Sequence, residues 1–249
     1  MRKLPALGMT PFEVAYLLAT PVLPPLHGLM RARLRRIVAT LPGSPEILDV
    51  GGRKSHCTIG LRGRITVSDL PRSSSIQESL HLGLNDSIRA QTLERRSNLA
   101  AVIYDDMTRT SLAPEAFDCV MAIEVLEHVE DDDAFVANIR RVLRPGGVFL
   151  MSTPNGDHLP VPMGDHKRHY RKAQLEALLG SALHDVRCEY AIVGGMYRGL
   201  GLKSWSSGAP LQTTLSMLGN LINHAQSMPY APGAKSARGT HHIVATAIK

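Results

Sequence analysis

Short apolar runs recur along the chain, and several of them stop at a glycine or an acid. Such runs of four to eight residues, bounded by turn residues, are typical of buried strands. They predict strands over residues 46–50, 64–68, 99–104, 116–123, 148–153, 186–193 and 242–248. Strands that alternate with helical patterns predict an α/β protein built on a mostly parallel sheet.

Helical spacing of apolar residues lies between these runs. It predicts helices over residues 11–19, 26–40, 85–96, 131–143, 172–179 and 211–226, whereas the polar stretch 70–84 predicts a loop. Thr10-Pro11 begins the first helix as an N-cap followed by proline. The acids Asp131, Asp132 and Asp133 favour the positive end of a helix dipole, so we interpret them as capping residues and not as a metal site. Only 13 residues separate Gly51 from Ile65, so the helix after the first strand is expected to be short or missing.

Two of the predicted strands end in residues suited to a nucleoside ligand. The first stops at Gly51-Gly52, where the missing Cβ atoms let the backbone approach a ligand closely. Asp69 follows Asp49 by twenty residues and ends the second strand, where a carboxylate can accept hydrogen bonds from two ribose hydroxyls. The later glycines of a dinucleotide fingerprint are absent, which disfavours a nicotinamide cofactor.

Three stretches in order resemble the class I S-adenosylmethionine (SAM) dependent methyltransferases. They are LDVGG at 48–52, FDCVMAIEVLEHV at 117–129 and LRPGGVFLMSTPN at 143–155, with the acid Asp69 between the first two. The resemblance covers residues 45–193 and implies a Rossmann-like sheet of seven strands with helices on both faces. Arg53 and Ser55 depart from it, since they stand where glycines are common in the family.

The resemblance also implies a cofactor site for S-adenosyl-L-methionine. The implied contacts are Asp49, Gly51, Gly52, Asp69, Asp106, Met107, Ile123 and Glu124. Asp106 matches the family acid near the adenine, and its neighbour Asp105 is an alternative for that role.

A second resemblance concerns the chemistry of proton removal. Glu124, Glu127 and His128, with His166 after the fifth strand, look like the metal site of small-RNA 2′-O-methyltransferases. Two carboxylates and two imidazoles suit one divalent ion, with Mn²⁺, Fe²⁺, Co²⁺ or Zn²⁺ preferred over Mg²⁺. The alternative without metal is His166 or His169 as a general base that Asp165 orients.

The composition and charge of the chain bear on whether it binds nucleic acid. The net charge is +6, but aromatics are only 4%, and no basic face with interleaved aromatics indicates an RNA-binding module. We interpret the basic block 31–36 as a solvated helix face. Three cysteines without metal spacing suit a reducing cytoplasm, and no apolar stretch predicts a transmembrane helix.

These observations predict four segments and one main activity. Residues 1–43 are expected to form a helical cap, 44–193 the SAM-binding core, 194–239 an inserted cap or oligomer segment, and 240–249 the final strand. If the sixth strand is parallel to the others, the insertion begins on the cofactor side. We expect an O-methyltransferase for a hydroxyl of a small molecule or glycan, with a sugar-like diol favoured; the EVLEHV and PGGVFLMSTPN stretches also resemble ubiquinone-pathway O-methyltransferases. The alternatives are an RNA 2′-O-methyltransferase and a non-catalytic protein of this fold, and a homodimer is expected through 1–43 or 194–239.

Overall fold

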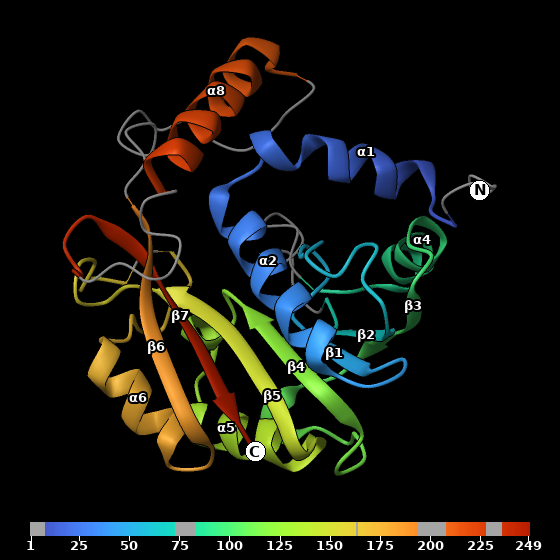
Figure 1. The fold of residues 1–249 in the computed structure, drawn as a ribbon, viewed down its shortest axis with the longest axis vertical. Helices are drawn as coiled ribbons and strands as arrows, with labels where there is room; N and C mark the ends of the chain where they lie inside the picture. The colour runs from blue at the N-terminus through green and yellow to red at the C-terminus, as the bar shows by residue number, and fades with distance from the viewer. Residues whose placement is uncertain (1–7, 73–82, 163, 194–207, 228–235) are drawn as a thin grey trace.

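Seven strands form one mixed sheet in the computed structural model (Figure 1). The structure describes residues 8–72, 83–162, 164–193, 208–227 and 236–249. The strands are β1 Glu46–Val50, β2 Arg64–Asp69, β3 Leu99–Tyr104, β4 Phe117–Ile123, β5 Leu143–Pro154, β6 His184–Val193 and β7 Thr240–Ile248. Their order across the sheet is β3-β2-β1-β4-β5-β7-β6. The predicted α/β fold with a Rossmann-like, seven-stranded sheet is therefore confirmed.

Strand direction sets which strand ends meet. Strands β1 to β5 pair in parallel, whereas β7 is antiparallel to both β5 and β6. Strand β6 consequently runs parallel to the first five, as predicted. The carboxyl ends of β1, β2, β3, β4 and β5 lie at one edge of the sheet, where ligands of open α/β sheets bind.

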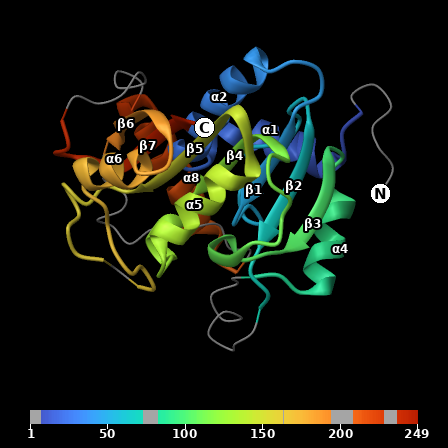
Figure 2. The same cartoon turned by 90° about the horizontal axis from the view of Figure 1, so that it is seen from below.

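Helices lie on both faces of the sheet, as Figures 1 and 2 show together. The α-helices are α1 Pro11–Ala19, α2 Pro25–Thr40, α4 Asp86–Arg95, α5 Asp132–Val142, α6 Lys172–Gly180 and α8 Pro210–Ser227. Short 3-10 turns are η1 Thr20–Val22, η2 Met107–Arg109 and η3 Leu126–His128. None of the helices in these described segments is long and apolar enough to cross a membrane.

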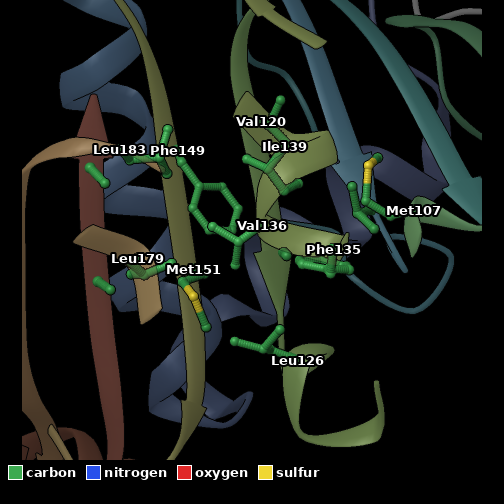
Figure 3. Close-up of a cluster of buried hydrophobic side chains, with 14 of the residues drawn as sticks. Met107, Val120, Leu126, Phe135, Val136, Ile139, Phe149, Met151, Leu179 and Leu183 are labelled. Atoms are coloured by element: carbon green, nitrogen blue, oxygen red, sulfur yellow. The ribbon is translucent and has the colours of Figure 1, made fainter. Parts of the chain in front are cut away.

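Each face of the sheet has its own hydrophobic cluster. On one face, Phe135 and Ile139 of α5 pack with Val120 of β4 and Phe149 of β5, and Leu179 of α6 joins them (Figure 3). On the other face, α2 contributes a row of buried apolar residues spaced for a helix: Leu26, Met30, Leu34 and Val38. Helix α2 is thus a layer of the sandwich, and a capping role for 1–43 stays a prediction.

Residues 51–63 contain turns and no helix, so the predicted shortening after β1 is confirmed. Gly60 and Gly63 adopt positive φ angles of 63° and 128° there, which favours turns over a helix. Strand β5 begins at Leu143, earlier than predicted, because Leu143 pairs with Phe117 before the register shifts. The predicted loop 70–84 lies mostly outside the described residues, as does Trp205 with the rest of 194–207.

Candidate active site

The turn after β1 depends on its two glycines. Gly51 has a φ of +64°, and a Cβ atom there would lie 2.7 Å from Cγ2 of Val125 in the loop after β4. A Cβ atom on Gly52 would lie 2.3 Å from Cγ of Asp49. Both contacts are far inside van der Waals distance, so neither position accepts a side chain without a shift of its neighbours.

Asp49 lies under this turn with its side chain fully buried. Burial raises the pKa of its carboxyl group to about 7, although the charge of Arg96 and the hydroxyls of Thr58 and Ser55 lower it. Neither carboxylate oxygen has a well-aligned hydrogen-bond partner among the described residues. Asp49 is therefore a desolvated acid at the base of the site and not a freely exposed ligand contact.

Asp69 ends β2 at the same edge. Its Oδ1 atom accepts a hydrogen bond of 2.8 Å from the backbone N–H of Leu70. Its Oδ2 atom lies 3.9 Å from Nε of Arg53, and the two side chains are 19% and 14% exposed. Burial raises the pKa of Asp69, while the Leu70 hydrogen bond and the charges of Arg53 and Lys54 oppose this shift. The family departure at Arg53 thus places a cation beside the predicted ribose acid.

The two acids after β3 have different partners. Asp106 caps η2, since its Oδ1 atom accepts from the backbone N–H and the hydroxyl of Thr108 at 3.0 and 2.7 Å, and Oδ2 accepts from Arg109. Asp105 accepts from the hydroxyl of Thr110 through Oδ1, and its buried Oδ2 has no partner in the described part of the chain. The Met107 side chain packs in the hydrophobic cluster with α5.

Glu124 directly follows Ile123, the last residue of β4, and has a φ of +53°. That left-handed conformation is uncommon for a residue with a side chain. Its Oε1 atom accepts a 2.8 Å hydrogen bond from the Ser152 hydroxyl and lies 3.2 Å from Nδ1 of His242. The carboxylate of Glu124 is thereby held by β5 and β7.

Three side chains after β4 and β5 converge. Glu127, His128 and His166 each offer a ligand atom, and these atoms all lie within 4.8 Å of one another. Glu124 is not a member of this group, so the structure brings together three of the four predicted metal ligands. The reason is local: β4 continues to Ile123, and η3 is a single tight turn of three residues, so Glu124 lies before the turn and not on a shared helical face.

The imidazole of His166 belongs to a hydrogen-bonded chain. Its Nδ1 atom lies 2.7 Å from Nε2 of His169, and Nδ1 of His169 lies 2.6 Å from the carbonyl oxygen of Leu159. A carbonyl only accepts, so Nδ1 of His169 carries a proton, and a neutral His169 accepts at Nε2. His166 then donates from Nδ1, which leaves its Nε2 atom with a lone pair. Burial, followed by the charges of His128 and His169, lowers the pKa of His166 and favours this neutral form.

Neighbouring side chains and burial also act on His128 and Glu127, the other two members of the cluster. Nδ1 of His128 lies 3.2 Å from Oδ2 of Asp165 without a well-aligned hydrogen bond, and orientation of His166 or His169 by Asp165 stays a prediction. Glu127 is fully buried, accepts from Thr153 through Oε2, and has no hydrogen-bond partner for Oε1 among the described residues. Burial, and then the negative charge of Glu124, raises its pKa well above the ordinary value. An unsatisfied carboxylate oxygen and two imidazoles therefore lie at one place.

Sequence reasoning misses two members of this region. Nothing in the sequence separates His242 from ordinary surface or core histidines, yet it is 5% exposed and contacts Glu124. Arg53 stands out in the sequence only as a departure from a glycine motif. No local pattern could reveal the His242 contact, because β7 brings together residues 118 positions apart.

Comparison with known proteins finds methyltransferases among the relatives of this chain. A methyltransferase domain family matches residues 79–151. A probable SAM-dependent methyltransferase of Mycolicibacterium smegmatis is 36% identical over 106 residues, which are 40% of this chain and 39% of the relative. The ubiquinone biosynthesis O-methyltransferase of Xanthomonas oryzae pv. oryzae is 30% identical over 193 residues, 69% of this chain and 74% of the relative.

The fold has solved counterparts as well. A SAM-dependent methyltransferase from Archaeoglobus fulgidus superposes with a TM-score of 0.53 at 16% identity, over 90% of this chain and 94% of that one. At that identity the likeness concerns the fold alone. The sequence match that spans about three quarters of a curated relative goes further: this chain belongs to the class I SAM-dependent methyltransferases.

Proposed function

We propose that this methyltransferase acts on a hydroxyl oxygen, in a small molecule or glycan that carries two adjacent hydroxyls. The observation that carries the proposal is the convergence of Glu127, His128 and His166 at the carboxyl edge of the sheet. The relatives named ubiquinone biosynthesis O-methyltransferases support oxygen as the acceptor atom. The choice of a sugar-like diol rests on the cluster, because grouped ligands or bases can engage two neighbouring oxygens.

The residues present fit a SAM molecule at this edge. When bound, the cofactor supplies an electrophilic methyl group on a sulfonium. In the proposed arrangement, Asp69 accepts from the ribose hydroxyls, and Gly51 and Gly52 let the backbone approach the methionine part. Asp105 offers a buried carboxylate oxygen without a partner among the described residues, which suits an adenine amino group better than the capped Asp106 does.

Proton removal from the acceptor falls to the histidine cluster. A hydroxyl is a weak nucleophile, and its proton must leave as its oxygen bonds to the methyl carbon. Nε2 of His166 has the free lone pair that a base needs, and His169 with the Leu159 carbonyl holds the ring in that tautomer. Alignment of the acceptor with the methyl group supplies several kcal/mol of the rate enhancement.

A divalent metal at the same place is the second form of the proposal. Glu127, His128 and His166 fit as three ligands of Mn²⁺, Fe²⁺, Co²⁺ or Zn²⁺, and Glu124 would need to rotate away from Ser152 to become the fourth. Such an ion would lower the pKa of a coordinated hydroxyl. Under either form, the cluster lowers the barrier to deprotonation of the acceptor.

The deciding experiment combines metal analysis with an acceptor panel. Purified protein would be assayed by elemental analysis, and transfer of a labelled methyl group from SAM would be followed with and without a chelator. Catechol and a cis-diol glycoside would serve as acceptors, with phenol and the deoxy glycoside as matched controls. We expect the diols to be methylated and the single hydroxyls to react poorly. Methylation of an oligoribonucleotide alone, or of amines alone, would contradict the proposal.

The ribose assignment has its own test. Asp69→Ala should weaken SAM binding by about 2 kcal/mol, since it removes a charged acceptor of two hydrogen bonds. Calorimetry of SAM binding measures the change. Asp133→Ala, an exposed acid in the first turn of α5, is the matched control and should bind SAM as the wild type does. Equal affinity in the Asp69 variant would remove this residue from the cofactor site.

A further inference from the structure

A strongly basic cavity lies beside the turn that follows β1. It has a volume of about 270 Å³. Arg53, Lys54 and His56 line it from the segment 51–63, Arg95 and Arg96 line it at the end of α4, and Phe12 lines it from α1. One side of α4 completes the wall. The cavity therefore occupies the region next to the segment that replaces the usual helix after β1.

The charged residues that line this cavity are all basic. Four of its lining residues are permanently or ordinarily cationic, and none of the described lining residues is an acid. Carboxylates outside the lining act on these cations, Asp49 on Arg96 and Asp69 and Asp165 on Lys54. Glu13 accepts hydrogen bonds from the backbone N–H groups of Thr10 and Ser97, and Asp69 accepts from Leu70 while it lies beside Arg53. Gathering like charges around a cavity is unfavourable unless an anion compensates them.

Arg96 is the most informative member. It is only 3% exposed, and its Nη2 atom donates to the hydroxyl of Thr58. Its Nε and Nη1 atoms are buried and have no hydrogen-bond partner among the described residues, and the same holds for Nδ1 of the neighbouring His56. The charges of Asp49 and Glu13 act on Arg96, but neither carboxylate bonds to these two nitrogens. A buried guanidinium with two unused donors lacks an acceptor.

The rim adds cations that an incoming ligand can reach. Arg95 is exposed and lies with its Cζ atom 5.6 Å from the centre of the Phe12 ring, which holds the guanidinium at the mouth. Lys54 is also exposed, on the opposite segment. The cavity thus has a buried donor at its base and two exposed cations at its entrance.

We propose that this cavity binds the phosphate group of a small molecule. Arginine presents paired N–H donors that match phosphate oxygens, and several cations favour a dianion over a single carboxylate. The volume lies just below the usual range for small-molecule sites, so it suits inorganic phosphate or a small phosphate ester and not a polymer. The site is separate from the histidine cluster and does not depend on the identity of the methyl acceptor.

Calorimetry with the full chain tests this proposal. Inorganic phosphate and glycerol 3-phosphate would be titrated at constant ionic strength, with sodium chloride as the reference. Saturable phosphate binding is expected, and Lys54→Gln and Arg95→Gln should each raise the Kd about tenfold, because each removes a charge-assisted contact. Arg89→Gln removes a cation from the same helix, where Arg89 lies over the Tyr104 ring, and should leave the Kd unchanged.

The outcomes separate the sources of the phosphate. Tighter binding of the ester than of inorganic phosphate would assign the site to an organic phosphate, and equal binding would assign it to the free ion. Binding no stronger than that of chloride would overturn the proposal. Equal affinity in wild type, Lys54→Gln and Arg95→Gln would overturn it too. An oligoribonucleotide that binds where both small phosphates fail would replace the small molecule with a nucleic acid.

Discussion

Asp49 is a buried acid at the base of the candidate active site, and its burial lowers the stability of the folded chain. Its pKa of about 7 in the folded chain compares with about 3.9 for an unfolded aspartate. Because the folded pKa is the higher one, the folded state holds the proton more tightly. Folding is therefore unpenalised below about pH 4, loses stability as the pH rises from about 4 to 7, and stays penalised above 7.

Asp49→Asn should remove this penalty. The variant should match the wild type near pH 4 and exceed its free energy of unfolding at pH 8, by roughly 4 kcal/mol at most for a shift of this size. Urea unfolding at both pH values measures the difference. Asp133→Asn, at an exposed position of α5, should show no such pH-dependent gain. A wild type that is as stable as the Asp49→Asn variant at pH 8 would show that Asp49 is not a buried acid with a raised pKa.

His169 offers a second test at this scale, through the pKa of its neighbour. Burial and the charges of His128 and His169 lower the pKa of His166, while Asp165 and Glu124 raise it. His169→Ala removes one lowering charge, so the acidic limb of kcat/KM should move to higher pH. The rate should also fall, because the His166 tautomer is no longer fixed. His169→Gln keeps an acceptor for His166 and should retain more activity; an unchanged acidic limb in both variants would exclude His166 as the base.

Sequence patterns identify some residues of the candidate active site but not others. Asp69 is recognisable because it ends an apolar run at a fixed distance from Asp49. The contact between Glu124 and His242 carries no such signal, because it joins the loop after β4 to the antiparallel last strand. The chain from His166 to the Leu159 carbonyl depends on how one loop folds back, which no spacing rule predicts.

At the scale of elements, the spacing of apolar residues predicts which segments form strands and helices. The sequence does not predict where the pairing of two strands begins. The apolar runs predict the seven strands within a few residues, and the short interval after β1 correctly predicts a missing helix. The early start of β5 at Leu143 escapes prediction, because Pro145-Gly146-Gly147 is a typical turn sequence and only the pairing with Phe117 extends the strand. The turn η3 likewise escapes prediction: it spans only Leu126–His128, and Glu124 lies before it and outside the cluster.

The segment 51–63 adjoins both the proposed SAM site and the proposed phosphate site, and this gives a third prediction. Arg53 lines the basic cavity and lies 3.9 Å from Asp69. A phosphate in the cavity competes with Asp69 for this cation, which leaves the carboxylate free for ribose hydroxyls. Saturating phosphate should therefore tighten SAM binding about fivefold, the lower end of typical coupling between sites. Calorimetry of SAM binding with and without phosphate measures it.

Two variants distinguish this coupling from a salt effect. Arg95→Gln should need about tenfold more phosphate for the same response. It should keep the SAM affinity measured without phosphate, because Arg95 reaches the cavity from α4 and not from the segment beside Asp69. Arg53→Gln should bind SAM equally well with and without phosphate. A phosphate response that survives in Arg53→Gln would show that the two sites are not linked through this residue.

At the scale of the whole molecule, the order of motifs along the chain identifies the class more firmly than any one motif does. Each motif falls at a strand end, and the parallel sheet brings those ends to one edge. The segments outside the sheet are less predictable, since their sequences carry no comparable constraint. The ends of helix α8 are predictable within a residue, but the polarity of its faces is not.

Helix α8 packs on the rest of the chain through polar residues. Ser216, Asn220 and Asn223 are its buried residues, and the Asn220 side chain donates to the carbonyl oxygen of Val22 at 2.8 Å. The opposite side carries leucines and isoleucine, 45% to 74% exposed in the described structure: Leu211, Leu215, Leu218 and Ile222. These residues are spaced by four, three and four, which is the repeat of a coiled-coil seam. Figure 1 shows α8 at the periphery of the molecule, and there it contacts η1, α2 and strand β6.

This face supports the prediction that 194–239 forms a subunit contact, with a second copy of the chain as the partner. A helix without Asp, Glu, Lys or Arg between 210 and 227 meets its own copy without repulsion, and the seam repeats in register. Light scattering after size exclusion should give a dimer mass for the wild type and a monomer mass for Leu215→Glu with Leu218→Glu. Gln212→Glu with Gln226→Glu adds the same two charges beside the seam and should remain dimeric. A monomeric wild type would contradict the dimer, and a dimeric seam variant would place the interface on another part of the chain, with residues 1–43 the next to test.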